Sequence, residues 1–400
     1  MQDKPALTRE RVLTALARRV PDRVPKTMSL CPSQLARFRQ ETGRDDPHAY
    51  FGIEVRGVDP LPARNGADFG RYLGDVQAGA RIDDWGIAWI RGDFHFERMI
   101  HPLRAASSVQ DALTYPYPNL LADERFAGYA ERIAEVHRQG YAVIANCMAV
   151  GGTVFWPAYK LRGMEAILVD LIANPDFAGA LLDIVTEMMA GLAARLASYD
   201  IDILWLADDF GTQRALMMRP KVWRAWFKER LRTVIAAAKS ARRPVAEPVE
   251  AAGFTRPSTG SGRVSVAEPV EAAGFTRPST GSGRELLVAF HSDGKIDEII
   301  PDLIEIGVDV LNPVQPEVMD PAAIKREFGR DLAFWGGLGT QTTLPFGSPD
   351  EVRRTVRDLI TTVGAGGGFL IAPTHVVEPE VPWENIIAFI EAVDEFGRYG

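Results

Sequence analysis

Residues 286–294 read LLVAFHSDG, a short apolar run that ends in polar and glycine residues. A segment with helical spacing follows, and the same pattern returns three more times in the last third of the chain. The later runs are Val308–Leu311, Leu332–Trp335 and Phe369–Ala372. Strands that alternate with helices predict a parallel sheet. Polar residues at the carboxyl end of every strand predict a site at the top of a barrel.

Earlier parts of the chain extend this pattern. Apolar runs at Val24–Leu30, Tyr141–Cys147 and Ile203–Ala207 predict three more strands, with helical segments between them. We expect one further strand between residues 50 and 120, where turn residues and tryptophans make the pattern harder to interpret. The total approaches the eight strands of a closed (β/α)8 barrel, which is the predicted fold class.

A tandem repeat precedes the first of these four runs. Val245–Arg263 reads VAEPVEAAGFTRPSTGSGR, and Val266–Arg284 repeats it letter for letter. Two copies are too few for a solenoid, which needs about three or more. The unit is rich in Pro, Gly, Ser and Thr and cannot bury enough apolar surface to offset its ordering entropy. We therefore expect residues 241–284 to be a disordered insert in a single barrel domain that spans residues 1–400; a docking peptide is the alternative.

Composition excludes several classes of protein. The net charge of −8 provides no basic surface, so we expect no nucleic-acid partner. The cysteines, Cys31 and Cys147, are too few for a disulfide framework and suit a reducing compartment. No apolar stretch reaches the roughly 18 residues of a membrane span, and the N-terminus has no signal-peptide core. We expect a cytoplasmic protein that does not enter membranes.

Three residues at strand ends could bind a metal. His291 and Asp293 stand two residues apart after one predicted strand, and His375 follows another. The strand ends of a barrel converge, so these side chains would supply nitrogen and oxygen ligands and leave a position open for substrate, as in a catalytic zinc site. The alternative is structural: Asp293 caps the helix that begins near Lys295, and His375 bonds a neighbouring loop.

Asp208 and Asp209 follow an uncharged strand and are candidate catalytic residues. Paired carboxylates at a strand end serve as acid and base, orient a ligand or hold a cation. The alternative is that they cap the turn at Gly211-Thr212. Further polar residues end the neighbouring strands. Glu317 is a catalytic candidate, Gly337 would let the backbone approach a ligand, and the remaining substrate-binding candidates are Gln213, Asn312, Gln315 and Gln341.

Motifs along nearly the whole chain outside the repeat resemble the uroporphyrinogen decarboxylase superfamily. Within it, the chain is similar to a branch related to cobalamin-dependent methyltransferases. The fold that this resemblance implies is a distorted (β/α)8 barrel. The motifs are RERVLTALARRVPDR (9–23), LRGMEA (161–166), ADDFGTQ (207–213), HSDGKI (291–296), IPDLIEIGVDVLNPVQPE (300–317), WGGLGTQ (335–341) and GGGFLIAPTHVVEPEVPWENI (366–386).

The resemblance implies a metal site with altered ligands. The family's methyltransferases hold zinc through a His-x-Cys pair and a later Cys. His291 matches the histidine, whereas Asp293 and His375 stand where the cysteines would be. These replacements are harder ligands, which argues against a thiol substrate and favours an oxygen-bound methyl group or another divalent metal.

Three functions follow as alternatives. The first is a metal-assisted methyltransferase that acts on a small molecule with a corrinoid carried by a partner protein, because the chain lacks a corrinoid-binding motif. The second is a decarboxylase of the uroporphyrinogen type, although Met28–Arg39 lacks the arginine cluster that an acidic tetrapyrrole needs. The third is a non-catalytic barrel that binds a small ligand. The resemblance also implies a possible homodimer.

Overall fold

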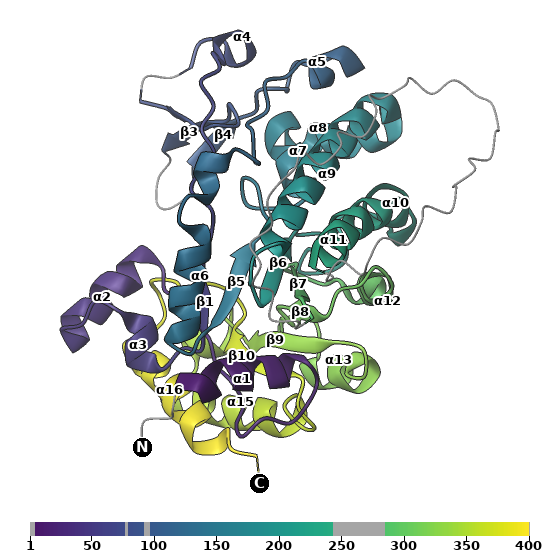
Figure 1. Cartoon of the computed structure of the whole chain (residues 1–400). Coiled ribbons are helices and arrows are strands. Elements are labelled where there is room, and N and C mark those ends of the chain that lie inside the picture. The colour runs from purple at the N-terminus through teal and green to yellow at the C-terminus, as the bar shows by residue number, and fades with distance from the viewer. Residues whose placement is uncertain (1–4, 77–78, 92–96, 243–284, 400) are drawn as a thin grey trace, which may run out of the picture.

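A seven-stranded parallel sheet forms the centre of the molecule (Figure 1). The computed structural model describes residues 5–76, 79–91, 97–242 and 285–399. Neighbouring strands follow the order β1-β5-β6-β7-β8-β9-β10, as consecutive strand–helix units require. The strands are β1 Val55–Gly57, β5 Ala142–Asn146, β6 Ile203–Ala207, β7 Leu287–His291, β8 Val310–Asn312, β9 Ala333–Leu338 and β10 Phe369–Pro373. The expected strand between residues 50 and 120 is β1.

Residues 24–30 take the eighth position of the barrel. The Thr27 N–H donates to the Ile371 carbonyl at 3.1 Å, and the Ile371 N–H donates to the Pro25 carbonyl at 3.0 Å. On the other side, the Glu54 N–H lies 3.4 Å from the Lys26 carbonyl oxygen. The segment therefore joins β10 to the chain just before β1. Backbone hydrogen bonds between this segment and β1 are sparse, and this is where the barrel is distorted. The predicted fold class is confirmed.

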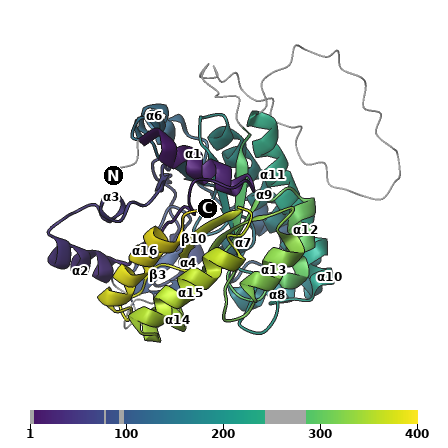
Figure 2. The same cartoon turned by 90° about the horizontal axis from the view of Figure 1, so that it is seen from below.

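Small and branched side chains fill the barrel interior. Ile203, Ala289, Val310, Ala333 and Leu370 form one buried cluster, with the tryptophans of β6 and β9 above them. Successive strand residues point to opposite faces, so every second residue of each strand belongs to this interior. Helix α1 (Pro5–Leu16) closes the amino-terminal end of the barrel, because its buried residues pack into the same cluster. Figure 2 views the molecule from below and shows α1 in front of the strands.

Helices cover the outside of the barrel. Pairs such as α9 with α11 and α15 with α16 pack against each other as well as against the sheet. The helices that follow β5 to β10 are α7 Phe155–Arg162, α8 Met164–Ala173, α9 Pro175–Ala197, α10 Pro220–Trp223, α11 Glu229–Arg242, α12 Ile300–Glu305, α13 Pro321–Phe328, α14 Thr343–Phe346, α15 Pro349–Thr362 and α16 Trp383–Phe396.

Helix α9 differs from the sequence expectation in one respect. Its 23 residues include an 18-residue window of mean hydropathy 1.5, so its length and composition would allow it to cross a membrane. Half of that window is buried inside the molecule. A core helix passes the same test, and α9 packs along α11 on the barrel surface.

The segment between β1 and β5 forms a small cap. A three-stranded antiparallel sheet of β2 (Arg81–Ile82), β3 (Ala88–Arg91) and β4 (Glu97–Ile100) lies at its centre. The cap contacts the start of the helical layer after β5, since the Leu103 N–H donates to the Leu161 carbonyl at 2.8 Å. It therefore lies beside the carboxyl end of the barrel. Its helices are α4 Gly70–Leu73 and α5 Val109–Leu113. Helix α6 Tyr129–Arg138 packs against β5 of the barrel, and α2 Pro32–Thr42 and α3 Pro47–Phe51 precede β1.

The tandem repeat lies outside the described residues from position 243 onward. Only Ala241 and Arg242, at the end of α11, belong to the described part of the expected insert. The prediction of a disordered insert in one barrel domain stays a prediction.

Candidate functional site

His291 and Asn312 face the interior at the carboxyl ends of β7 and β8. In β7, His291 is in phase with Leu287 and Ala289, which pack in the barrel cluster. In β8, Asn312 is in phase with Val310, and the strand register pairs it directly with His291. The period-two alternation of strands thus brings both polar side chains into the bowl of the barrel.

Asn312 fixes the tautomer of His291. Its side-chain amide donates to the Trp335 carbonyl at 2.8 Å, so its Oδ1 atom is the one that faces the imidazole. Oδ1 lies 2.5 Å from His291 Nδ1. An amide oxygen can only accept, so Nδ1 carries the proton and the Nε2 lone pair of the neutral ring points the other way. A fixed outer hydrogen bond of this kind is typical of metal-binding histidines.

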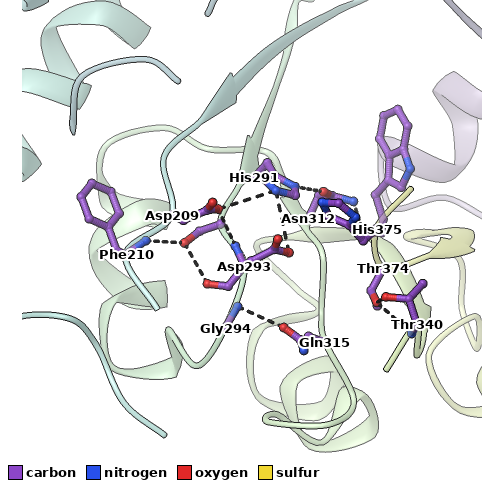
Figure 3. A network of polar contacts seen from close by, with 12 residues as sticks. Asp209, Phe210, His291, Asp293, Gly294, Asn312, Gln315, Thr340, Thr374 and His375 are labelled. Atoms are coloured by element: carbon purple, nitrogen blue, oxygen red, sulfur yellow. Dashed lines mark hydrogen bonds and ion pairs between the residues drawn. The ribbon is translucent and has the colours of Figure 1, made fainter. Parts of the chain in front are cut away.

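Two carboxylates meet this lone pair. His291 Nε2 lies 3.7 Å from Asp209 Oδ1 and 3.8 Å from Asp293 Oδ1 (Figure 3). Asp209 Oδ1 also accepts the backbone N–H of Asp293 at 2.9 Å, which joins the loops after β6 and β7. Burial raises the pKa of Asp293, and the nearby Asp209 charge raises it further, while His291 and His375 oppose this. A shared proton or a cation between these donor atoms would offset the repulsion of the two carboxylates.

The geometry of this cluster fits a divalent cation. One donor atom from each of Asp209, His291 and Asp293 lies within 4.8 Å of the others, and all three side chains are partly buried. One imidazole nitrogen and two carboxylate oxygens suit zinc, iron(II), cobalt or manganese and leave positions open for a substrate. The three side chains come from strand ends and their first loop residues, so the barrel holds them in place.

Two glycines allow the loops of the cluster to touch. A Cβ atom at Gly211 would lie 2.5 Å from the Asp293 carbonyl oxygen, and one at Gly294 would lie 2.6 Å from the Gly211 carbonyl carbon. Gly294 also has a φ of +81°, which residues with a side chain rarely adopt. Each of these two loops therefore carries a glycine where it touches the other: Gly211 follows Asp209, and Gly294 follows Asp293.

His375, the third expected metal ligand, does not join the cluster. In β10 the interior phase passes through Leu370 and Ala372 to Thr374, which is buried. His375 is therefore out of phase; its side chain is 51% exposed and its Nδ1 atom lies 3.8 Å from a Glu378 carboxylate oxygen. The structure does not bring His375 together with His291 and Asp293; Asp209 lies beside them. His375 still lines, with His291, a cavity of about 220 Å³ above Trp205 and Trp335.

The same alternation separates Asp208 from Asp209. Asp209 is in phase with the interior residues Ile203 and Trp205, whereas Asp208 points toward the helices. It is buried, and its carboxylate accepts the backbone N–H groups of Val154 at 2.8 Å and Trp156 at 2.9 Å, at the start of α7. Burial raises the pKa of Asp208 to about 7, although these bonds lower it. Asp208 holds the amino terminus of α7 and is not brought into the cluster.

The other expected site residues connect the strand-end loops. Gln315 accepts the Gly294 N–H at 3.1 Å and donates to Gln213 at 3.3 Å. Glu317 accepts the Gln341 N–H at 3.0 Å, while one of its oxygens is buried without a hydrogen bond in the described part of the chain. The Gln341 and Gln213 side chains are exposed at the rim.

The surroundings of Gly337 differ from those expected for a glycine beside a ligand. A Cβ atom there would lie 3.4 Å from both Leu359 and Phe369, which belong to the outer core between sheet and helices. Its positive φ of 89° and this contact give it a role in packing. The expectation that Gly337 brings its backbone close to a ligand stays a prediction.

The sequence analysis missed two residues of α7 that lie near the cluster. Asp209 is close enough to raise the pKa values of Tyr159 and Lys160, although burial is the larger influence on each. Trp156 lies one turn before Lys160 and contacts it. One sequence feature could have indicated these residues: a tryptophan and a lysine four residues apart in the helix after β5.

Comparison with known proteins gives three findings. A family model described as uroporphyrinogen decarboxylase (URO-D) matches residues 101–396. The methylcobamide:CoM methyltransferase MtaA of Methanosarcina barkeri is 27% identical over 110 residues, which are 28% of this chain. The match spans 31%, or about a third, of that curated relative. A solved methyltransferase from Methanosarcina mazei superposes with a TM-score of 0.60 at 18% identity, over 97% of this chain and 98% of that one, a likeness of fold.

Proposed function

Because the chain belongs to the uroporphyrinogen decarboxylase (URO-D) family, we propose that it is a metal-assisted methyltransferase within that family. The observation that carries the proposal is the cluster of Asp209, His291 and Asp293 at the carboxyl end of the barrel. The methyltransferase relatives support the reaction class, and the donor set supports the metal. We propose further that the methyl group passes between a small molecule and a corrinoid carried by a partner protein.

In this proposal Asp209, His291 and Asp293 hold the cation. When bound, a divalent cation supplies Lewis acidity toward the heteroatom that carries or receives the methyl group. Asn312 keeps the ligand nitrogen of His291 free of its proton. Hard oxygen donors favour an oxygen-bound methyl group over a thiol.

The remaining residues shape and support the site. Trp205 and Trp335 meet edge to face with ring centroids 5.0 Å apart. Together they form the floor of the cavity beside His291 and keep water from the barrel interior. Gln315 ties the Asp293 loop to the loop of Gln213, so the ligand loops cannot separate freely. Thr340 and Thr374 join the loops after β9 and β10 through hydroxyls 3.0 Å apart.

Decarboxylation of a uroporphyrinogen has less support. Eight carboxylates on such a substrate would need several cations near the bowl. The described residues that line the cavity with His291 include no arginine or lysine. Arg37 and Arg39, in the region where the family's arginine motif would lie, are exposed and paired with Glu41 and Asp45.

Metal content tests the proposal. The purified full-length chain should bind one equivalent of zinc or cobalt by elemental analysis and by calorimetric titration. Asp209→Asn and His291→Ala should each lose it, because each removes one of three ligands. His375→Ala should retain the metal, since that side chain lies outside the cluster. Retention by Asp209→Asn with loss by His375→Ala would overturn the ligand set.

Methyl transfer is tested separately. The metal-loaded protein is incubated with cob(I)alamin and a methyl ether or methanol, and the formation of methylcobalamin is followed by its visible absorption. The reverse direction is followed from methylcobalamin. We expect turnover that disappears in His291→Ala. A protein that binds metal stoichiometrically but transfers no methyl group in either direction from any of these substrates would count against the reaction.

A further inference from the structure

Lys160 lies between two tryptophan rings next to the cluster. Its Nζ atom is 4.5 Å from the ring centroid of Trp156 on α7 and 5.3 Å from that of Trp89 in β3 of the cap. The Lys160 carbonyl lies 2.7 Å from His101 Nδ1, so the same residue joins α7 to the cap. Lys160 is only 7% exposed. A cation is thus enclosed where the cap meets the carboxyl end of the barrel.

The Lys160 ammonium has no polar partner. It makes no hydrogen bond and no ion pair with any residue that the structure describes. Burial lowers its pKa to about 8, although the charges of Asp83 and Asp209 raise it, so the group is largely protonated at neutral pH. A buried ammonium is costly unless it is paired, and the two ring faces offset only part of that cost. Three N–H donors are left for a ligand.

A glycine and two tryptophans surround the Lys160 ammonium. Gly151, in the loop after β5, is exposed, and a Cβ atom there would lie 3.0 Å from Nζ. A larger residue at this position would press on the ammonium. Trp89 and Trp156 are themselves partly exposed, so the lysine is covered by groups that a ligand can reach. The charge of Asp209 is close enough to raise the pKa of Lys160, although burial has the larger effect and lowers it.

We propose that Lys160, with the faces of Trp89 and Trp156, is a binding subsite for a singly charged oxyanion of the small-molecule substrate. The anionic group is a carboxylate or a sulfonate, and the rest of the molecule extends toward Asp209, His291 and Asp293. Asp83 and Asp209 would repel a doubly charged phosphate, which is why a single charge is favoured. This inference rests on the proposed function, because it names the class of substrate that the same site takes.

Titration of the metal-free full-length chain with small anions tests the subsite. Sodium propionate, ethanesulfonate and inorganic phosphate are added at constant ionic strength, and binding is followed by calorimetry and by tryptophan emission. We expect saturable binding of propionate or ethanesulfonate, and the stronger of the two identifies the head group. Lys160→Met should weaken that binding at least tenfold, because it removes the charge and keeps the shape.

Lys325 provides a matched control. It is also a lysine whose pKa is lowered by burial and whose Nζ lies 5.7 Å from an aromatic ring, that of Phe334. Its Nζ atom, however, donates to the Gly367 carbonyl at 2.6 Å and is therefore already satisfied. Lys325→Met should leave anion binding unchanged. The melting temperature of Lys160→Met should be no lower than that of the wild type, since the substitution removes an unpaired buried charge. If Lys160→Met does not fold, Lys160→Gln is the second neutral variant.

The results separate this inference from the proposed function. Absence of saturable binding of both monoanions to the wild type, equal binding by Lys160→Met, or tightest binding of phosphate would overturn the subsite. Lys160-dependent anion binding in a protein that transfers no methyl group would support the subsite and reject the methyltransferase. Methyl transfer that does not change in Lys160→Met would support the methyltransferase and reject the subsite.

Discussion

A single amide decides which nitrogen of His291 faces the carboxylates. Asn312 is 6% exposed and uses both of its polar atoms, one toward the Trp335 carbonyl and one toward the imidazole. Removal of that amide would free the ring to rotate or to change its tautomer. The metal binding that we propose for the cluster would thus depend on a residue that offers no ligand itself.

We predict that Asn312→Leu weakens metal binding about 10- to 100-fold, because the orientation of His291 is no longer fixed. Calorimetric titration with zinc measures the change. Asn385→Leu is the matched control, since Asn385 is also buried and donates to the backbone carbonyls of Leu344 and Gly347 at 2.8 Å. Both variants should lose about 1–3 kcal/mol of unfolding free energy through an unpaired carbonyl. Equal metal affinity in the two variants would contradict the tautomer argument.

His137 is a second histidine whose surroundings only the structure reveals. It lies on α6, and its Nε2 atom is 3.0 Å from Asp202, with its Nδ1 atom 3.5 Å from Asp200. Burial lowers the pKa of His137, but the two carboxylates together outweigh burial and raise it above its ordinary value of 6.5. Folding therefore strengthens proton binding at this site.

This raised pKa predicts a pH dependence of stability. The contribution of His137 is fully present below about pH 6.5, the ordinary value, and is lost as the pH rises through the folded-state pKa. The free energy of unfolding, measured in urea from pH 5.5 to 8.5, should therefore fall with rising pH. In His137→Gln this part of the slope should vanish. An unchanged slope in the variant would assign the pH dependence to other groups.

At the scale of elements, strand periodicity sorts the candidate residues. Asp209 and His291 continue the interior phase of β6 and β7, while Asp208 and His375 continue the opposite phase of their strands. The sequence contained this distinction, because a strand of alternating faces fixes which of two adjacent residues points inward. Candidates chosen by chemistry alone, without this phase, included two that do not join the cluster.

The contact between the β6 and β7 loops gives a prediction for Gly294. Gly294→Ala should destabilise the fold by at least about 1–2 kcal/mol and weaken metal binding, because its Cβ atom would press on Gly211 and separate Asp209 from Asp293. Gly43→Ala is the control for backbone strain alone. Gly43 has a similar positive φ of 65° but open space around it. Chemical denaturation and zinc titration of both variants measure the two effects; equal behaviour would show that the loop contact is unimportant.

At the scale of the molecule, the tandem repeat joins two fixed ends. α11 ends at Arg242, whose guanidinium donates to the Tyr199 carbonyl at 2.6 Å, and β7 begins at Leu287. Both ends belong to the barrel scaffold. In a (β/α)8 barrel, a helix ends and the next strand begins on the face opposite the site.

Replacement of residues 245–284 by a short Gly-Ser linker should leave metal binding unchanged and alter stability little. Each halving of a flexible loop gains about 0.6 kcal/mol, so a rise of roughly 1–2 kcal/mol in unfolding free energy is expected. Arg242 is retained because of its bonds to Tyr199 and Asp200. Thermal and urea unfolding measure the change. A large loss of stability or of cooperativity would show that the repeat is part of the folded domain.

The sequence by itself determined the barrel and two residues of the candidate site. Short apolar runs such as Leu286–Phe290 alternate with helical segments, and this periodicity permits few arrangements other than a parallel barrel. The same regularity places polar residues after each run at one end, which is why His291 and Asp293 could be selected before any coordinates.

Only the tertiary structure decided which residues complete the site. Asp209 joins His291 and Asp293 because β6 lies beside β7 in register, and Lys160 meets Trp89 because the cap folds back onto α7. These contacts join residues far apart along the chain. Periodicity is a local property and gives the face on which a side chain lies, whereas the distance between two faces is set by how the whole barrel packs.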